Sequence, residues 1–304
     1  MITPLINADR LANNLEIPLL YIKREDLHPY GSHKGRSLPL MIEKYVAEGW
    51  QNFVISSSGN AALAAALFIK EYNIKNHHKK LHLKIYTGYK IDKTKFAHLL
   101  QITYLPLGQK IKNFFFQIKP EIKIRQTLNP KQSAFLAEKN SKTKNLRQSI
   151  DDTALLGYTQ LAKELSQLPN LSAVFIPTSS GTTAQGLYQG FEKLNLKPEI
   201  YIIQTPTCHP FIQNDLTEKD SLAKAIVDKV GRRKKEITNI LSLTNGEGLI
   251  VNNQELISAE KIYKTFYPAD KISYNSLLSL AGLIQKINTG KKFSGPVVCL
   301  FTGK

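Results

Sequence analysis

Cysteine is scarce in this chain: Cys208 and Cys299 are the only two among 304 residues. Neither has a histidine or a second cysteine at the spacing of a metal-ligand pair. A disulfide scaffold and a structural zinc site are therefore both disfavoured. We expect two free thiols and no metal site.

Long hydrophobic runs are also missing. The longest, residues 61–69, is far shorter than the run of about 18 apolar residues that a membrane-spanning helix needs. The first residues, MITPLINADRLANN, have no basic segment followed by an apolar one, so no secretory signal is predicted. We expect a cytoplasmic protein that has no membrane partner.

Acidic residues are few: 24 Asp and Glu stand against 41 Lys and Arg, which gives a net charge of +17. Basic runs at residues 75–80 and 232–235 are compatible with a nucleic-acid partner. These runs are short and scattered, and no recognition motif accompanies them. We therefore disfavour nucleic acid as a partner and attribute the charge to solvated lysines, which would also attract an anionic cofactor or substrate.

Short strand-like runs alternate with helical patterns along most of the chain. This alternation predicts an open, mostly parallel α/β sheet. The predicted strands are residues 19–23, 53–55, 81–86, 173–176, 200–204 and 297–301, and the predicted helices are residues 37–48, 61–72, 93–100, 183–194, 258–266 and 277–287. Residues 108–147 and 217–245 are weakly periodic, and no element is predicted there.

Lys34 lies in a Pro/Gly-containing loop, residues 23–36, between a predicted strand and a predicted helix. A lysine at a helix start is close to the positive end of the helix dipole. Together with partial burial, the dipole would lower its pKa. A neutral amine is what imine chemistry requires, so Lys34 is a candidate catalytic residue, although for any one lysine taken alone a solvated position at a helix start is the better interpretation.

Two further loops join a strand to a helix and consist of small, hydroxyl-rich residues. Residues 56–61, SSSGNA, offer hydroxyls and backbone N–H groups suited to a carboxylate, and residues 177–184, PTSSGTTA, offer a similar set suited to a phosphate. The second loop lacks the lysine of a Walker sequence, which disfavours nucleoside triphosphates. Each loop could also be an ordinary capped turn. A fourth segment, Phe301-Thr302-Gly303-Lys304, ends a strand on a hydroxyl.

Together these segments resemble the pyridoxal-phosphate enzymes of the tryptophan synthase β group. This group includes threonine synthases, serine/threonine dehydratases and cysteine synthases. The resemblance begins at Thr3-Pro4-Leu5 and includes KREDLHPYGSHKGR at residues 23–36, followed in the family's order by the Ser-Gly-Asn loop, the small-residue loop and the terminal Thr-Gly.

The resemblance implies pyridoxal 5′-phosphate as the cofactor and assigns residues to it. Lys34 would bind it as an imine and move the Cα proton, Asn60 would contact its phenolic oxygen, and Thr302 would face its pyridine nitrogen. The residues implied to bind its phosphate are Ser179, Ser180, Gly181, Thr182 and Thr183.

The resemblance also implies a small amino-acid substrate. Its carboxylate would be bound by Ser57, Ser58, Gly59 and Asn60. A hydroxyl at position 302 does not stabilise a protonated pyridinium as a carboxylate would, so the ring is a weaker electron sink. We therefore expect elimination or replacement at Cβ or Cγ, with a leaving group such as hydroxyl, phosphate, acetate or thiol.

Several subfamilies remain open. The SSSGNA loop favours a threonine synthase-like or serine/threonine dehydratase-like lyase. Residues 180–187, together with Tyr274, are similar to the D-cysteine desulfhydrase branch, and a cysteine synthase is a further alternative. Threonine synthases usually carry Asp where this chain has Gly35. A degenerate homologue that binds the cofactor without catalysis is the non-enzyme alternative.

For the architecture, the resemblance implies two open, twisted, mostly parallel α/β domains with the cofactor in the cleft between them. Residues 1–35 and 148–304 would form the larger, phosphate-binding domain. Residues 36–147 would form a smaller, mobile domain that carries the Ser-Gly-Asn loop. A homodimer is the implied assembly.

Overall fold

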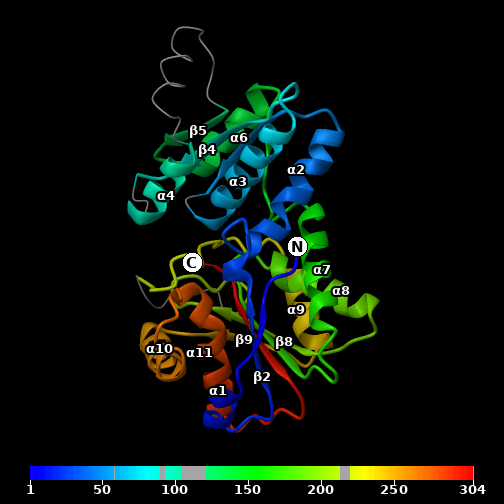
Figure 1. Ribbon diagram of the computed structural model, residues 1–304, viewed down its shortest axis with the longest axis vertical. Coiled ribbons are helices and arrows are strands. Elements are labelled where there is room, and N and C mark those ends of the chain that lie inside the picture. Colours follow the sequence, from blue (N-terminus) through cyan, green and yellow to red (C-terminus); the bar gives the residue numbers. More distant parts are fainter. Residues whose placement is uncertain (58, 90–92, 104–120, 213–219, 304) are drawn as a thin grey trace. The chain divides into compact units, whose positions relative to one another are not determined.

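The chain folds into two compact units, shown in the computed structural model of Figure 1. The structure describes residues 1–57, 59–89, 93–103, 121–212 and 220–303. The larger unit comprises Met1–His28 and Gln148–Lys304, and the smaller unit comprises Pro29–Arg147. The structure places residues 29–35, and with them Lys34, in the smaller unit, whereas the sequence-based expectation grouped them with the larger domain.

The larger unit contains a six-stranded sheet in the order β1-β2-β10-β7-β8-β9. β1 pairs antiparallel with β2, and the other four pairings are parallel. The carboxyl ends of β2, β10, β7, β8 and β9 therefore share one edge of the sheet. The strands are β1 (Leu5–Asn7), β2 (Leu20–Arg24), β7 (Ala173–Pro177), β8 (Glu199–Gln204), β9 (Glu247–Ile250) and β10 (Val297–Phe301).

Helices cover both faces of this sheet because successive side chains of a buried strand point to opposite sides. In β7, Phe175 belongs to the core cluster that contains side chains of α1, α10 and α11, whereas Val174 and Ile176 belong to the cluster that contains side chains of α7, α8 and α9. Figure 1 shows the two helical layers on either side of the strands. The helices are α1 (Asp9–Asn14), α7 (Thr153–Leu165), α8 (Thr182–Lys193), α9 (Lys234–Leu243), α10 (Asn253–Phe266) and α11 (Tyr274–Asn288).

Two glycines allow α8 to pack closely on α7. A Cβ at Gly186 would lie 2.7 Å from the Leu155 carbonyl oxygen, and one at Gly190 would lie 2.5 Å from the Ala162 Cβ. Both distances are too short for a real contact. Because the glycines are about one helical turn apart on α8, the close approach extends along the helix pair.

The smaller unit contains a parallel sheet in the order β5-β4-β3-β6. Its helices bury apolar side chains such as Ala62, Ala65 and Ile69 of α3. Its elements are α2 (Leu38–Ala47), β3 (Asn52–Ser56), α3 (Asn60–Lys75), β4 (His82–Thr87), α4 (Lys93–Thr103), β5 (Ile122–Gln126), α6 (Pro130–Asn140) and β6 (Lys144–Asn145).

The predicted α/β class with mostly parallel sheets is confirmed, and each predicted strand and helix coincides with an element of the structure. The two weakly periodic segments also contain elements: β5, α6 and β6 in the first, and α9 in the second. In the described parts of the chain, no helix is long and apolar enough to cross a membrane. Cys208 and Cys299 are both buried, and neither forms a disulfide within the described structure.

Candidate functional site

Lys34 lies in a short 3-10 helix, His33–Arg36, that precedes α2 in the smaller unit. The Ser32 side chain caps this helix by accepting a hydrogen bond from the Lys34 backbone N–H at 3.2 Å. Lys34 is half-buried, and its neighbours His33, Gly35 and Arg36 are buried. The predicted helix start at Lys34 is thus a single 3-10 turn, and the α-helix begins at Leu38.

The loop that carries Lys34 packs against α3. Gly31 has a positive φ of 81°, and a Cβ there would lie 2.7 Å from Leu63 in the first turn of α3. The Tyr30 hydroxyl donates to Glu71 of the same helix at 2.5 Å. Burial, followed by the hydrogen bond to Glu71, raises the pKa of Tyr30, so the phenol remains a donor. These contacts fasten the Lys34 loop to the helix that begins at Asn60.

The Ser-Gly-Asn loop follows β3 and leads into α3. The Ser57 N–H donates to the Tyr86 carbonyl at 3.2 Å, and the Gly59 N–H donates to the Ser57 hydroxyl at 3.3 Å. Among the described residues no side chain caps α3, so N–H groups of its first turn have no side-chain acceptor. Ser57, Gly59 and Asn60 are half-buried, while Ser58 is outside the described residues.

The loop formed by residues 178–183, termed the anion loop below, joins β7 to α8 in the larger unit. Gly181 has a positive φ of 80° and forms the N-cap, and in the described structure no side chain caps α8. Ser180 and Thr182 place their hydroxyl oxygens 2.9 Å apart, and the Thr182 hydroxyl also donates to the Gln148 carbonyl at 3.1 Å. Hydroxyls and helix N–H groups are thus gathered in one loop, as anion binding requires.

Ser179 has a structural contact that the sequence did not predict. Its hydroxyl oxygen accepts hydrogen bonds from the backbone N–H groups of Val227 (3.0 Å) and Asp228 (3.1 Å). The hydroxyl proton is not used in these two bonds. Ser179 therefore fastens residues 227–228 to the anion loop and can still donate one hydrogen bond.

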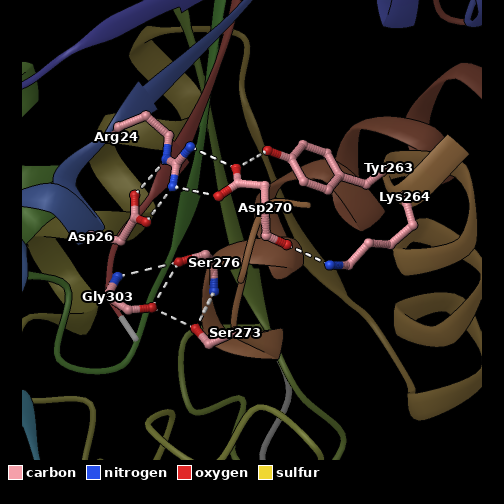
Figure 2. A network of polar contacts seen from close by, with 8 residues as sticks. All are labelled: Arg24, Asp26, Tyr263, Lys264, Asp270, Ser273, Ser276 and Gly303. Atoms are coloured by element: carbon pink, nitrogen blue, oxygen red, sulfur yellow. Dashed lines mark hydrogen bonds and ion pairs between the residues drawn. The ribbon is translucent and has the colours of Figure 1, made fainter. Parts of the chain in front are cut away.

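Thr302 follows β10 directly and is buried. Because β10 and β7 are adjacent and parallel, Thr302 and the anion loop lie at the same edge of the sheet. Ser276 at the start of α11 donates to the Gly303 carbonyl at 2.8 Å and accepts from its N–H at 3.2 Å. Ser273 also donates to that carbonyl (Figure 2). Both the N–H and the carbonyl of Gly303, the residue after Thr302, are thus hydrogen-bonded to serines at the start of α11.

Charged residues of the KRED motif are buried beside Thr302, and Figure 2 shows part of their network. Arg24 is paired in register with Phe301 of β10. Its guanidinium binds Asp26 at 2.9 and 2.8 Å and Asp270 at 2.6 and 3.2 Å. The motif is visible in the sequence, but no local pattern connects it with Asp270, which lies 246 positions away from Arg24.

Two pKa shifts accompany this network. Burial alone lowers the pKa of Arg24, but the hydrogen bonds and charges of Asp26 and Asp270 outweigh it and raise the pKa. Burial, followed by the hydrogen bond to Asp270, raises the pKa of Tyr263, whose hydroxyl donates to Asp270 at 2.6 Å. Arg24 therefore stays cationic and Tyr263 stays neutral around neutral pH. The remaining motif residues are also paired, because Lys23 binds the Thr3 carbonyl and Glu164, and Thr3 binds Glu25.

The family model described as "pyridoxal-phosphate dependent enzyme" matches residues 2–77 and 122–303, which is most of the chain. The chain belongs to this family. The resemblance inferred from the motifs is thereby confirmed, as is the predicted cofactor, pyridoxal 5′-phosphate.

Individual members of this pyridoxal-phosphate dependent family match over nearly the full length. Threonine synthase of Halalkalibacterium halodurans is 22% identical over 316 aligned residues, covering 99% of this chain and 81% of that protein. The L-serine ammonia-lyase of Rhizomucor miehei superimposes with a TM-score of 0.77 at 16% identity, covering 100% of this chain and 93% of that one. Threonine deaminase isoform 2 of Solanum lycopersicum superimposes with a TM-score of 0.77 at 19% identity, covering 99% and 83%. These structures show that the fold is shared.

The donor set of this chain fits the cofactor of the family. The anion loop offers hydroxyls and helix N–H groups to a phosphate, and Gly181 leaves no Cβ at its turn. Lys34 supplies an amine, and Thr302 a hydroxyl at the end of β10. Pyridoxal phosphate, when bound, supplies an electron sink for negative charge that develops next to the amino group of a substrate.

Gly181→Ala tests the turn of the anion loop. A Cβ there would lie 2.9 Å from Ile237 and 3.2 Å from Phe211, and φ is positive. We expect a loss of about 2–4 kcal/mol in the free energy of unfolding, from strain and overpacking together, and weaker cofactor binding. Urea unfolding and an absorbance titration with pyridoxal phosphate measure the two effects.

Gly290→Ala is the matched control. Gly290 has a similar φ of 84°, but a Cβ there has nothing within 4 Å. The Gly290→Ala variant should lose only the part of the unfolding free energy that comes from the positive φ, about 1 kcal/mol, and should bind the cofactor as the wild type does. Equal losses in the two variants would show that contact with Ile237 and Phe211 is unimportant.

Proposed function

We propose that this protein is a pyridoxal-phosphate-dependent lyase acting on a small amino acid. It would catalyse elimination or replacement at Cβ or Cγ, in the manner of a threonine synthase or a serine/threonine dehydratase. The observation that carries the proposal is the buried Thr302 hydroxyl at the end of β10, because a hydroxyl facing the pyridine nitrogen would stabilise a protonated ring less than a carboxylate would. The names of the matched relatives, a threonine synthase, a serine ammonia-lyase and a threonine deaminase, support the same class.

Each group of residues has a proposed role. Lys34 would hold the cofactor and exchange the proton at Cα of the amino acid. Thr302 would contact the pyridine nitrogen, and Asn60 the phenolic oxygen. The phosphate would be bound by Ser179, Ser180, Gly181, Thr182 and Thr183, and the substrate carboxylate by Ser57, Ser58, Gly59 and Asn60.

The local structure supports both anion-binding roles. The anion loop and the Ser-Gly-Asn loop each open a helix, α8 and α3, that has no side-chain cap among the described residues. Free N–H groups at a helix start stabilise negative charge, and the helix dipole adds to the effect. The homodimer and the cytoplasmic location inferred from the sequence stay predictions.

An absorbance titration tests the function. Purified protein is mixed with pyridoxal phosphate and then with serine, threonine, phosphohomoserine, O-acetylserine or D-cysteine, while ammonia, phosphate or sulfide release is followed. We expect the band of lysine-bound cofactor and a spectral shift with at least one of these amino acids, together with release of ammonia, phosphate or sulfide from it.

The outcomes separate the alternatives. Product formation confined to O-acetylserine in the presence of added sulfide would favour the cysteine synthase-like reaction, and sulfide release confined to D-cysteine would favour the desulfhydrase-like reaction. A cofactor band that no amino acid changes would favour the non-catalytic homologue and overturn the lyase proposal.

A further inference from the structure

Arg233 differs from its neighbours in the basic run at residues 232–235. Arg232, Lys234 and Lys235 are exposed, whereas Arg233 is only 5% exposed. It is the residue immediately before α9, and its side chain is directed into the larger unit. Arg233 therefore lies in the interior, although in the sequence it is part of a run of basic residues whose other members are exposed.

Four hydrogen bonds connect the Arg233 guanidinium to two other parts of the larger unit. Nη1 donates to Asp152 at 2.8 Å and to Gln185 of α8 at 2.7 Å. Nη2 donates to the carbonyls of Gln148 at 3.3 Å and Asp151 at 3.4 Å. One side chain thus ties residues 148–152, where the chain re-enters the larger unit, to the helix that follows the anion loop.

The Gln148 carbonyl links Arg233 to the anion loop itself, because it also accepts from the Thr182 hydroxyl at 3.1 Å. The segment that leads to Arg233 contacts the loop as well. The N–H groups of residues 227–228 bind the Ser179 hydroxyl, and Ile237 packs against Gly181. The shape of the anion loop therefore depends on the segment formed by residues 227–237.

The positive charge of Arg233 is incompletely balanced. Among the described residues, the one carboxylate bound to it is Asp152, whose side chain is 78% exposed and therefore screened by solvent. Its buried Nε has no hydrogen-bond partner in the described structure. A buried cation is unfavourable unless negative charge is close. An anion bound in the neighbouring loop would supply such charge.

We propose that Arg233 is a positioning residue of the anion loop. It holds the Gln148 carbonyl that orients the Thr182 hydroxyl, and its charge favours a dianion in the loop. This inference rests on the proposed role of residues 179–183 as the phosphate site of the cofactor. It predicts that Arg233 affects binding through the phosphate group and not through the pyridine ring.

Arg233→Met tests this, with Arg232→Met as the matched control that removes the same charge from the exposed neighbour. Dissociation constants are measured by absorbance for pyridoxal phosphate and for pyridoxal, which lacks the phosphate. We expect Arg233→Met to weaken pyridoxal phosphate binding by about ten- to a hundredfold, as for loss of charged hydrogen bonds. Pyridoxal binding should stay within about twofold, and Arg232→Met should change neither constant.

Two different failures are distinguishable. A wild-type protein that binds both compounds equally well would overturn the phosphate role of the anion loop. A wild-type preference for pyridoxal phosphate that persists in Arg233→Met would leave that role intact and overturn the Arg233 inference. An equal loss of affinity for both compounds would also overturn it, since it would indicate a general structural defect.

A second variant covers the case in which Arg233→Met does not fold. Gln185→Met removes only the hydrogen bond from the guanidinium to α8 and keeps a side chain of similar length. It should reduce the preference for pyridoxal phosphate over pyridoxal in the same direction, by a smaller factor. An unchanged preference in Gln185→Met contradicts the proposal.

Discussion

Lys34→Ala is expected to abolish the cofactor band and to lower turnover by on the order of 10³-fold or more. Alanine has no amine, so it can neither attach the cofactor nor exchange a proton at Cα. The fold should be retained, because Lys34 is half-buried in a short 3-10 helix that Ser32 caps through the backbone N–H. Absorbance after addition of pyridoxal phosphate, and product release, measure the two effects.

Lys70→Ala is the control for Lys34→Ala. Lys70 lies on α3 of the same unit and is exposed, so its removal deletes one positive charge without touching the Lys34 loop. It should retain both the band and the activity of the wild type. Turnover at the wild-type rate in Lys34→Ala would remove Lys34 from its proposed role.

Arg24→Met is expected to destabilise the larger unit by about 3–5 kcal/mol, the typical cost of removing one partner of a buried ion pair. Arg24 is 6% exposed and Asp26 is 2% exposed, so the Asp26 carboxylate would be left in the interior without its cation. The Asp270 carboxylate would lose the same partner and keep the hydrogen bond from the Tyr263 hydroxyl, while the Lys264 ammonium would still donate to the Asp270 backbone carbonyl. Urea unfolding followed by circular dichroism measures the loss.

Lys271→Met is the control for Arg24→Met. Lys271 follows Asp270 directly but is exposed, so removing its charge should change the unfolding free energy by less than about 0.5 kcal/mol. If Arg24→Met were no more destabilising than this control, the Arg24–Asp26–Asp270 network would contribute little to the stability of the fold.

The α/β fold could be predicted from the sequence because buried strands and amphipathic helices have characteristic periods. Val297–Phe301 is a continuous apolar run, as a strand buried on both faces requires, and it forms β10. β5 and α9 were not predicted. The strand Ile122–Gln126 is short and partly exposed, so its apolar signal is weak, whereas α9 does have amphipathic spacing, with Ile237 and Ile240 buried, and was missed beside a basic run.

The loops of the candidate site could be predicted from short local motifs, whereas the residues that support them from distant parts of the chain could not. Lys34, the Ser-Gly-Asn loop and the anion loop each lie at a strand-to-helix junction, where small and hydroxyl residues form a short, recognisable pattern. Ser273 and Ser276 belong to no such pattern. They hold Gly303 because α11 starts beside the end of β10, although the residues are 30 and 27 positions apart.

The sequence by itself determined the alternation of strands and helices, the loops that end the strands, and the motif order that identifies the family. All of these depend on residues close together in the chain. Only the tertiary structure decided that Arg233 turns inward while Arg232 stays in solvent, and that Arg24 pairs with Asp270. Such choices depend on which side chains packing brings together across long separations, and neighbouring residues of the same type carry no local signal to distinguish them.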